Sequence, residues 1–158
     1  MAYSLKEVPY SDLTDLMREA MDSQGLLPLT EDVQPFLQVL PELFQSHPDY
    51  HPFLFLENET QPVGFIVALP HREPGTLSIG PMYISRQYRG QGLGYRLVEA
   101  LIQWAKTYGI AFLSTQTWGR NAPSRRIFEK LGFECVGEQP NTRVDTDGTV
   151  RYLLRIEA

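Results

Sequence analysis

The chain has 158 residues, of which 42% are apolar and 21% are charged, as in an ordinary globular domain with one sizeable core. Its formal net charge of −5 argues against nucleic acid as the principal ligand. No apolar run approaches the length of a membrane span, and the N-terminus lacks the basic-then-apolar pattern of a signal peptide. We therefore expect a single domain over residues 1–158 in the cytoplasm, with no nucleic-acid or membrane partner.

The first half of the chain contains signals for both helices and strands. Alternating apolar residues predict a first strand over 3–8. A helix that begins at Ser11 or Asp12 and ends near Ser23 follows, with its apolar residues on one face. Three further elements are predicted in this half: a helix over about 30–44 and strands over 53–56 and 63–68.

The second half begins with a strand, a helix and a strand. A strand over about 76–84 precedes a helix over about 92–108 and a strand over 110–115, and a crossover of this length predicts parallel strands. A short helix over 122–131 comes next. The last elements are strands over 133–137 and 150–156, with turn residues over 145–148. Cys135, the one cysteine, cannot form an internal disulfide, and we expect it to pack as a small apolar residue.

A glycine-rich loop joins the strand over 76–84 to the following helix. Its sequence is Arg89-Gly90-Gln91-Gly92-Leu93-Gly94. The first N–H groups of a helix have no intrahelical partner and the helix dipole favours negative charge there, so the loop is a candidate phosphate site. Taken alone, the loop also fits an ordinary glycine-rich turn. The glycine spacing matches neither a Walker A loop nor a dinucleotide-binding G-x-G-x-x-G loop.

Three segments together resemble the GNAT (GCN5-related) N-acetyltransferase family. The segment 88–94 resembles the R/Q-x-x-G-x-G/A signature of that family. The segment 82–87 resembles the end of its fourth strand, and the segment 121–133 resembles its N-x-x-A-x-x-L-Y-x-K-x-G-F block. The segments occur in the order and at roughly the separation of the family, and they cover about residues 77–138.

The resemblance implies a mixed α/β fold and an acyl-CoA cosubstrate. The implied GNAT fold has a central, mostly antiparallel sheet flanked by helices, in which strands four and five are parallel and splayed around the acyl-CoA. Acetyl-CoA or CoA is the expected ligand, with no metal. The residues implied to bind it are Met82, Tyr83, Ile84, Arg89, Gly90, Gln91, Gly92, Leu93, Gly94, Asn121, Ser124 and Phe128.

Several of these residues also have a purely structural interpretation. The amides of Gly90–Gly94 are expected to surround the pyrophosphate, where Gly92 and Gly94 permit close backbone approach. Asn121 matches a family asparagine that contacts the cofactor arm, and it is equally suited to cap the following helix. A cluster of cations on that helix is expected to meet cofactor phosphates or to face solvent: Arg125, Arg126 and Lys130.

Phe128 departs from the family pattern, because many relatives have a tyrosine there that protonates the leaving thiolate. Phenylalanine has no proton to donate, and the loss of a positioned acid costs about 10²–10⁴-fold in rate unless another group replaces it. Ser124 and Tyr83 are the candidate substitutes, and water is the alternative that we favour. Glu73 is the first candidate for the general base, and Glu57 and Glu59 are the others. The histidines show no metal-ligand spacing: His47, His51 and His71.

The expected function is transfer of an acetyl group from acetyl-CoA to a primary amine, by direct attack in a ternary complex. One alternative is a non-catalytic acyl-CoA-binding module, which the loss of tyrosine at Phe128 makes credible. Another is an interaction domain without a cofactor, which the complete Arg89–Gly94 loop argues against. The sequence contains no motif that identifies the amine acceptor. A homodimer is a further expectation that the resemblance implies, because many relatives form dimers, and the sixth strand and the last hairpin offer exposed edges that a partner could cover.

Overall fold

The computed structural model describes residues 2–22, 49–119, 121–140 and 148–157. Within them the strands are β1 (Tyr3–Glu7), β2 (His51–Glu57), β3 (Gln61–Pro70), β4 (Thr76–Ile84), β5 (Phe112–Trp118), β6 (Glu134–Gln139) and β7 (Thr149–Arg155). The helices are α1 (Thr14–Asp22), α3 (Leu93–Thr107) and α4 (Ala122–Lys130), with 3-10 turns at Tyr10–Leu13 and Arg86–Tyr88. The helix predicted over 30–44 and most of the turn predicted over 145–148 lie outside the described residues.

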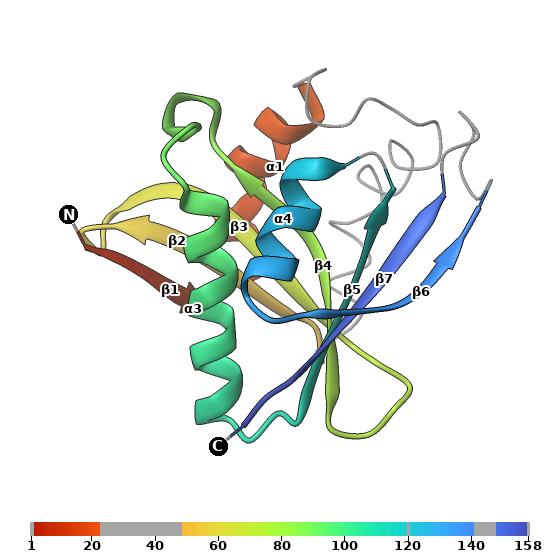
Figure 1. Ribbon diagram of the computed structural model, residues 1–158. Helices are drawn as coiled ribbons and strands as arrows, with labels where there is room; N and C mark the ends of the chain where they lie inside the picture. Colours follow the sequence, from red (N-terminus) through yellow and green to blue (C-terminus); the bar gives the residue numbers. More distant parts are fainter. Residues whose placement is uncertain (1, 23–48, 120, 141–147, 158) are drawn as a thin grey trace.

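The described strands form one seven-stranded sheet in the order β1-β2-β3-β4-β5-β7-β6. Neighbouring strands are antiparallel except for β4 and β5, which are parallel and are connected through α3. The predicted fold class, a mostly antiparallel mixed sheet with one parallel pair, is confirmed. β7 lies between β5 and β6, so β6 is the edge strand at this side and β7 is internal (Figure 1).

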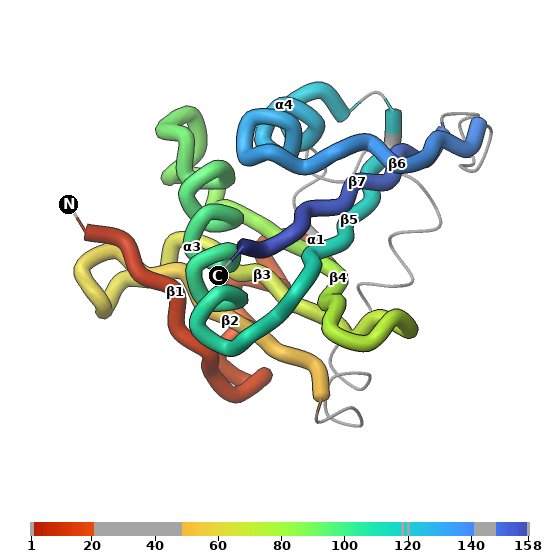
Figure 2. Tube along the Cα trace, turned by 60° about the horizontal axis from the view of Figure 1, so that its bottom comes forward, coloured from red at the N-terminus to blue at the C-terminus, as the bar shows by residue number. Residues whose placement is uncertain are grey.

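Helices cover both faces of the sheet (Figure 1). The face under α3 and α4 holds the larger apolar core, to which β2 contributes Phe53 and Phe55. The face under α1 holds a second core, to which β2 contributes Leu54 and Leu56. This alternation follows from the two-residue period of a strand, which sends successive side chains to opposite faces. Figure 2 shows α3 beside β1 to β3 and α4 beside β6 and β7.

β4 and β5 separate along their length. The two strands pair only from Thr76–Ser78 to Phe112–Ser114, although β4 continues to Ile84 and β5 to Trp118. Their divergence toward the top of the view is visible in Figure 1. In β4, two residues lie opposite Val67 of β3, and these are Gly80 and Pro81. β4 therefore has a bulge here, at the place where proline lacks the N–H that a regular ladder would use.

Two sequence expectations about local structure are wrong. The helix expected to begin at Ser11 or Asp12 is preceded by a 3-10 turn, and α1 begins only at Thr14, whose hydroxyl donates to the Ser11 carbonyl at 2.9 Å. Cys135 is exposed and does not pack in a core. The reason is that β6 is an edge strand with almost all of its side chains exposed to solvent.

Candidate active site

The glycine loop leaves the start of α3 without a side-chain cap. Gly90 and Gly92 have φ of 79° and 75°, a left-handed conformation that favours glycine. Gly92 is the N-cap of α3, and no side chain caps this end of the helix. The first N–H groups of α3 are therefore open to an external anion, as expected from the sequence. Gln91 is exposed beside them, whereas the Leu93 side chain is buried in the core.

Gly94 has a structural role in the packing of two helices. A Cβ atom at this position would lie 3.1 Å from Cδ1 of Ile127 in α4, which is tighter than an ordinary contact. By contrast, a Cβ atom at Gly90 or Gly92 would have no described atom within 4 Å. Gly94 therefore permits close packing of α3 against α4, while the other two glycines are required by their backbone conformation.

Arg89 connects the loop to the end of β4. Its Nε donates to the Ile84 carbonyl at 3.2 Å, and its guanidinium lies 5.3 Å from the centre of the Tyr83 ring. The terminal guanidinium nitrogens have no hydrogen-bond partner among the described residues, and the side chain is exposed. Arg89 is thus fixed at one end and free to bind a phosphate at the other.

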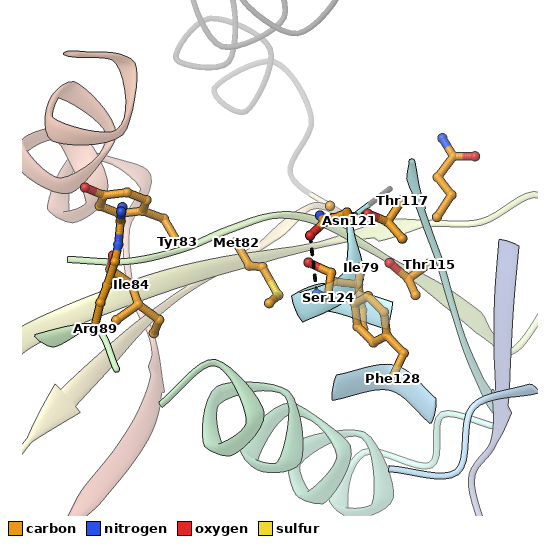
Figure 3. Close-up of a pocket in the computed structure, with 12 residues that line it drawn as sticks. Ile79, Met82, Tyr83, Ile84, Arg89, Thr115, Thr117, Asn121, Ser124 and Phe128 are labelled. Atoms are coloured by element: carbon orange, nitrogen blue, oxygen red, sulfur yellow. Dashed lines mark hydrogen bonds between the residues drawn. The ribbon is translucent and has the colours of Figure 1, made fainter. Parts of the chain in front are cut away.

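A cavity of about 310 Å³ occupies the space between β4 and β5. This volume falls in the range of about 300–1,000 Å³ that is typical of ligand pockets. Seven of the residues predicted from sequence to bind acyl-CoA line this cavity (Figure 3): Met82, Tyr83, Ile84, Arg89, Asn121, Ser124 and Phe128. The divergence of the strands creates this space, because their unpaired halves leave a gap in the sheet.

Asn121 holds the start of α4 at the side of the cavity. Its Oδ1 accepts a hydrogen bond from the Ser124 N–H at 3.3 Å, and its Nδ2 donates to the Thr117 hydroxyl of β5 at 2.9 Å. The expected helix cap is therefore present. The second hydrogen bond attaches the helix to the strand across the gap, so that the first turn of α4 and β5 form one wall of the cavity.

We expect Asn121→Ala to destabilise the protein by about 0.5–2 kcal/mol, because it removes the N-cap of α4. Asn121→Asp is the matched control, since aspartate keeps the capping oxygen but loses the donor to Thr117. Denaturant unfolding of both variants measures the two contributions separately. A stability of Asn121→Ala equal to that of the wild type would contradict the capping role.

Phe128 is an apolar wall of the cavity. Its side chain is 3% exposed, and its ring centre lies 5.3 Å from that of Phe133 and 5.8 Å from that of Tyr152. The nearby phenol of Tyr152 is already engaged, because it donates to Glu129 Oε2 at 2.7 Å and accepts from Arg125 Nε at 3.0 Å. Phe128 has no hydroxyl and the Tyr152 hydroxyl is already hydrogen-bonded, so neither residue presents a free phenol to the cavity.

Tyr83 contributes its ring to the cavity, but its hydroxyl points toward α1 and away from Ser124 (Figure 3). Burial of this side chain and the neighbouring Glu19 carboxylate raise the pKa of Tyr83 to about 12. Glu19 accepts a hydrogen bond from the Ser85 hydroxyl at 3.1 Å. Within the described residues, neither the Tyr83 hydroxyl nor Glu19 Oε2 has a hydrogen-bond partner of good geometry. A phenol with a raised pKa is a weaker acid, and this one is oriented away from the other polar groups of the cavity.

The three carboxylates considered as bases do not line the cavity. Glu73 is exposed on the turn before β4, at the end where β4 and β5 are still paired. Glu57 ends β2, and Glu59 lies on the turn that follows, with φ of 64°. The structure therefore does not bring any of them together with Ser124 or Phe128.

Two of the three cations on α4 contact other side chains or backbone of the described residues. Arg125 donates to the Tyr152 hydroxyl and, through Nη1 at 3.0 Å, to the Gly119 carbonyl. The Lys130 ammonium lies 5.8 Å from the centre of the Tyr95 ring. Arg126 is exposed and has no described contact. Arg125 therefore ties α4 to the sheet instead of facing a ligand.

Sequence reasoning missed the part of the cavity that β5 provides. Thr115 and Thr117 are 5% and 6% exposed, and both line the cavity together with Gln116. The missed signal was the polar run Ser114-Thr115-Gln116-Thr117, which follows the apolar start of the strand. Ile79, at the point where β4 leaves β5, was also missed.

Metal-binding groups and membrane-spanning helices are both absent from the described residues. No group of three or more His, Cys, Asp or Glu side chains in this part of the chain could hold a metal ion. His51 instead pairs with Glu7 at 2.8 Å, at the start of β2. Among the described helices, none has the length and apolar character needed to cross a lipid bilayer.

Comparison with known proteins identifies the family of this chain. Residues 13–133 match the family described as "Acetyltransferase (GNAT) family". This match covers more than half of the chain, so the chain belongs to the GNAT family of acetyltransferases. The resemblance proposed from the motifs is thereby confirmed, and with it the class of enzyme, an acetyltransferase family that uses acetyl-CoA.

Individual relatives agree with this assignment. "Putative phosphinothricin acetyltransferase YwnH" of Bacillus subtilis (strain 168) is 30% identical over 139 residues, which are 81% of this chain and 80% of that protein. N-acetyltransferase family 8 member 2 of Rattus norvegicus is 28% identical over 103 residues, covering 62% of this chain and 46% of the longer protein. The solved structure described as "Structure of yncA, a putative acetyltransferase from Salmonella typhimurium with its cofactor Acetyl-CoA" has the same fold, with a TM-score of 0.77 at 18% identity over 99% of this chain and 95% of that one.

Proposed function

We propose that the protein transfers the acetyl group of acetyl-CoA to a primary amine, by direct attack within a ternary complex. The observation that carries this proposal is that the cavity and the uncapped start of α3 lie next to each other. The cavity between β4 and β5 leads along Met82–Ile84 to Arg89, and the uncapped start of α3 lies directly after Arg89 in the chain. A long ligand with a phosphate-rich end and an apolar arm fits this arrangement.

Each part of the site has a physical task in this proposal. The open N–H groups from Gly90 to Gly94 bind the pyrophosphate, and Arg89 adds charge-assisted hydrogen bonds. The backbone of Met82–Ile84, which β5 leaves unpaired, binds the amide groups of the pantetheine arm. Phe128 packs against the arm and excludes water from it. Bound acetyl-CoA supplies an activated thioester, so the protein has mainly to position the amine and stabilise the leaving sulfur.

The test is acetylation of a panel of primary amines with acetyl-CoA, followed by mass spectrometry. The panel contains phosphinothricin, because YwnH carries that name, together with L-lysine, spermidine and a peptide with an N-terminal alanine. We expect acetyl-CoA-dependent acetylation of at least one panel amine, with a rate well above that of the uncatalysed mixture.

A non-catalytic acyl-CoA-binding module is the second candidate, and Phe128 is the observation that favours it. The same experiment separates the two functions. Tight binding of CoA without acetylation of any panel amine would support the binding module and would contradict the enzyme.

A further inference from the structure

Thr115 has a hydroxyl that the fold itself does not use. The residue is 5% exposed on β5, lines the cavity, and faces the side where Ser124 and Phe128 lie (Figure 3). Its hydroxyl has no hydrogen-bond partner among the described residues. Thr117, two residues further along the same face, is equally buried but accepts a hydrogen bond from Asn121. The Thr117 oxygen is therefore engaged with the cap of α4, whereas the Thr115 hydroxyl is engaged with no described residue.

Ser124 presents a second hydroxyl to the same cavity from the first turn of α4. Its backbone N–H is used by the Asn121 cap, whereas its side chain forms no hydrogen bond with any described residue. The start of a helix carries a partial positive charge, and thiolates are stabilised at such positions. Ser124, Thr115 and Phe128 thus surround one part of the cavity, where two donors flank an aromatic ring that has none.

We propose that the hydroxyls of Thr115 and Ser124 donate hydrogen bonds to the sulfur of bound CoA and stabilise it as the thiolate. This inference rests on the proposed function. In the transfer, the bond from the amine nitrogen to the acetyl carbon forms as the carbon–sulfur bond breaks. The electron pair of the broken bond goes to sulfur, and the amine proton goes to solvent water. The two hydroxyls take the place of the tyrosine hydroxyl that Phe128 lacks. The role proposed for Thr115 and Ser124 therefore belongs to a site with phenylalanine at this position.

The direct test is the pKa of the CoA thiol when CoA is bound, measured from the ultraviolet absorbance of the thiolate. The wild-type protein should lower this pKa below that of free CoA. Thr115→Val and Ser124→Ala should each raise it by about one unit, which is a tenfold change in the ionisation constant. Ser114→Ala is the control, because Ser114 lies on the same strand but does not line the cavity, and it should leave the pKa of the bound thiol unchanged. Arg89, the charged residue in the cavity lining, is retained in every variant.

Turnover of a panel amine provides the second readout. Thr115→Val and Ser124→Ala should each lower kcat by about 10- to 100-fold while the affinity for CoA stays within about threefold. Phe128→Tyr should restore much of the rate in the variant that lacks both hydroxyls, because it supplies a donor from the same wall. Thermal unfolding verifies that each variant is folded.

Three results would overturn the inference. One is a bound-thiol pKa that is the same in the wild type, Thr115→Val and Ser124→Ala, and another is an equal shift in Ser114→Ala. The third is failure of the wild type to bind CoA, which would remove the proposed function as well. Binding of CoA with an unchanged thiol pKa would therefore contradict the role of the two hydroxyls alone.

Discussion

Gly92→Val should reduce the affinity for CoA by at least about 100-fold, which corresponds to roughly 2.7 kcal/mol of binding free energy. Gly92 has φ of 75° at the N-cap of α3, and a β-branched residue disfavours this conformation by about 1–2 kcal/mol. The valine side chain would also project from the loop whose N–H groups are proposed to bind the pyrophosphate. Isothermal calorimetry with CoA measures the effect.

Gly109→Val is the matched control for this experiment. Gly109 also has a left-handed backbone, with φ of 71°, and a Cβ atom there would likewise have no described atom within 4 Å. It follows the opposite end of α3, so Gly109→Val should lose a similar amount of stability and keep its affinity for CoA. Equal CoA affinity in folded Gly92→Val and in the wild type would contradict the assignment of the loop.

Gly64→Ala should destabilise the protein by about 1–3 kcal/mol, the usual cost of overpacking. A Cβ atom on Gly64 of β3 would collide with the Tyr83 carbonyl oxygen and would lie 2.9 Å from Ile84 Cδ1. Backbone cannot move aside as a side chain does, so β4 must shift at the residues proposed to bind the pantetheine arm. We therefore expect a lower melting temperature, by about 2–4 °C for each kcal/mol, together with weaker CoA binding.

Gly137→Ala is the control for a glycine within a strand. Gly137 lies on β6, and a Cβ atom there would have no described atom within 4 Å. Alanine in place of glycine should therefore leave stability unchanged or raise it by up to about 1 kcal/mol. If Gly64→Ala unfolds at the same temperature as Gly137→Ala, the close approach of β3 to β4 has no energetic consequence.

Local sequence patterns were sufficient to predict the strand–loop–helix unit that is proposed to bind phosphate. The spacing of glycines and arginine from Arg89 to Gly94, followed by an amphipathic helix, is determined by residues close together in the chain. The cap at Asn121 is local in the same way, because it acts on Ser124 three residues later. The fold class was implied by the resemblance to the GNAT family, and the parallel pairing of β4 and β5 followed from the length of the crossover between them.

Features that depend on distant residues were not predicted. Cys135 resembles a core residue in sequence, and only the position of β6 at the edge of the sheet explains its exposure. Thr115 appears in sequence as one of four consecutive polar residues of β5. Its place in the cavity depends on where β4 and β5 cease to pair. The buried contact between Glu19 and Ser85 links residues 66 positions apart, although Glu19 borders the apolar face of α1.

The most direct test of the site is a crystal structure of the protein with bound CoA. The pyrophosphate should lie on the N–H groups of Gly90–Gly94, and the pantetheine arm should lie between β4 and β5 along Met82–Ile84. The sulfur should lie within hydrogen-bond distance of Thr115 and Ser124 and next to Phe128. A CoA molecule bound elsewhere, with the gap between β4 and β5 empty, would contradict the proposed site and the function derived from it.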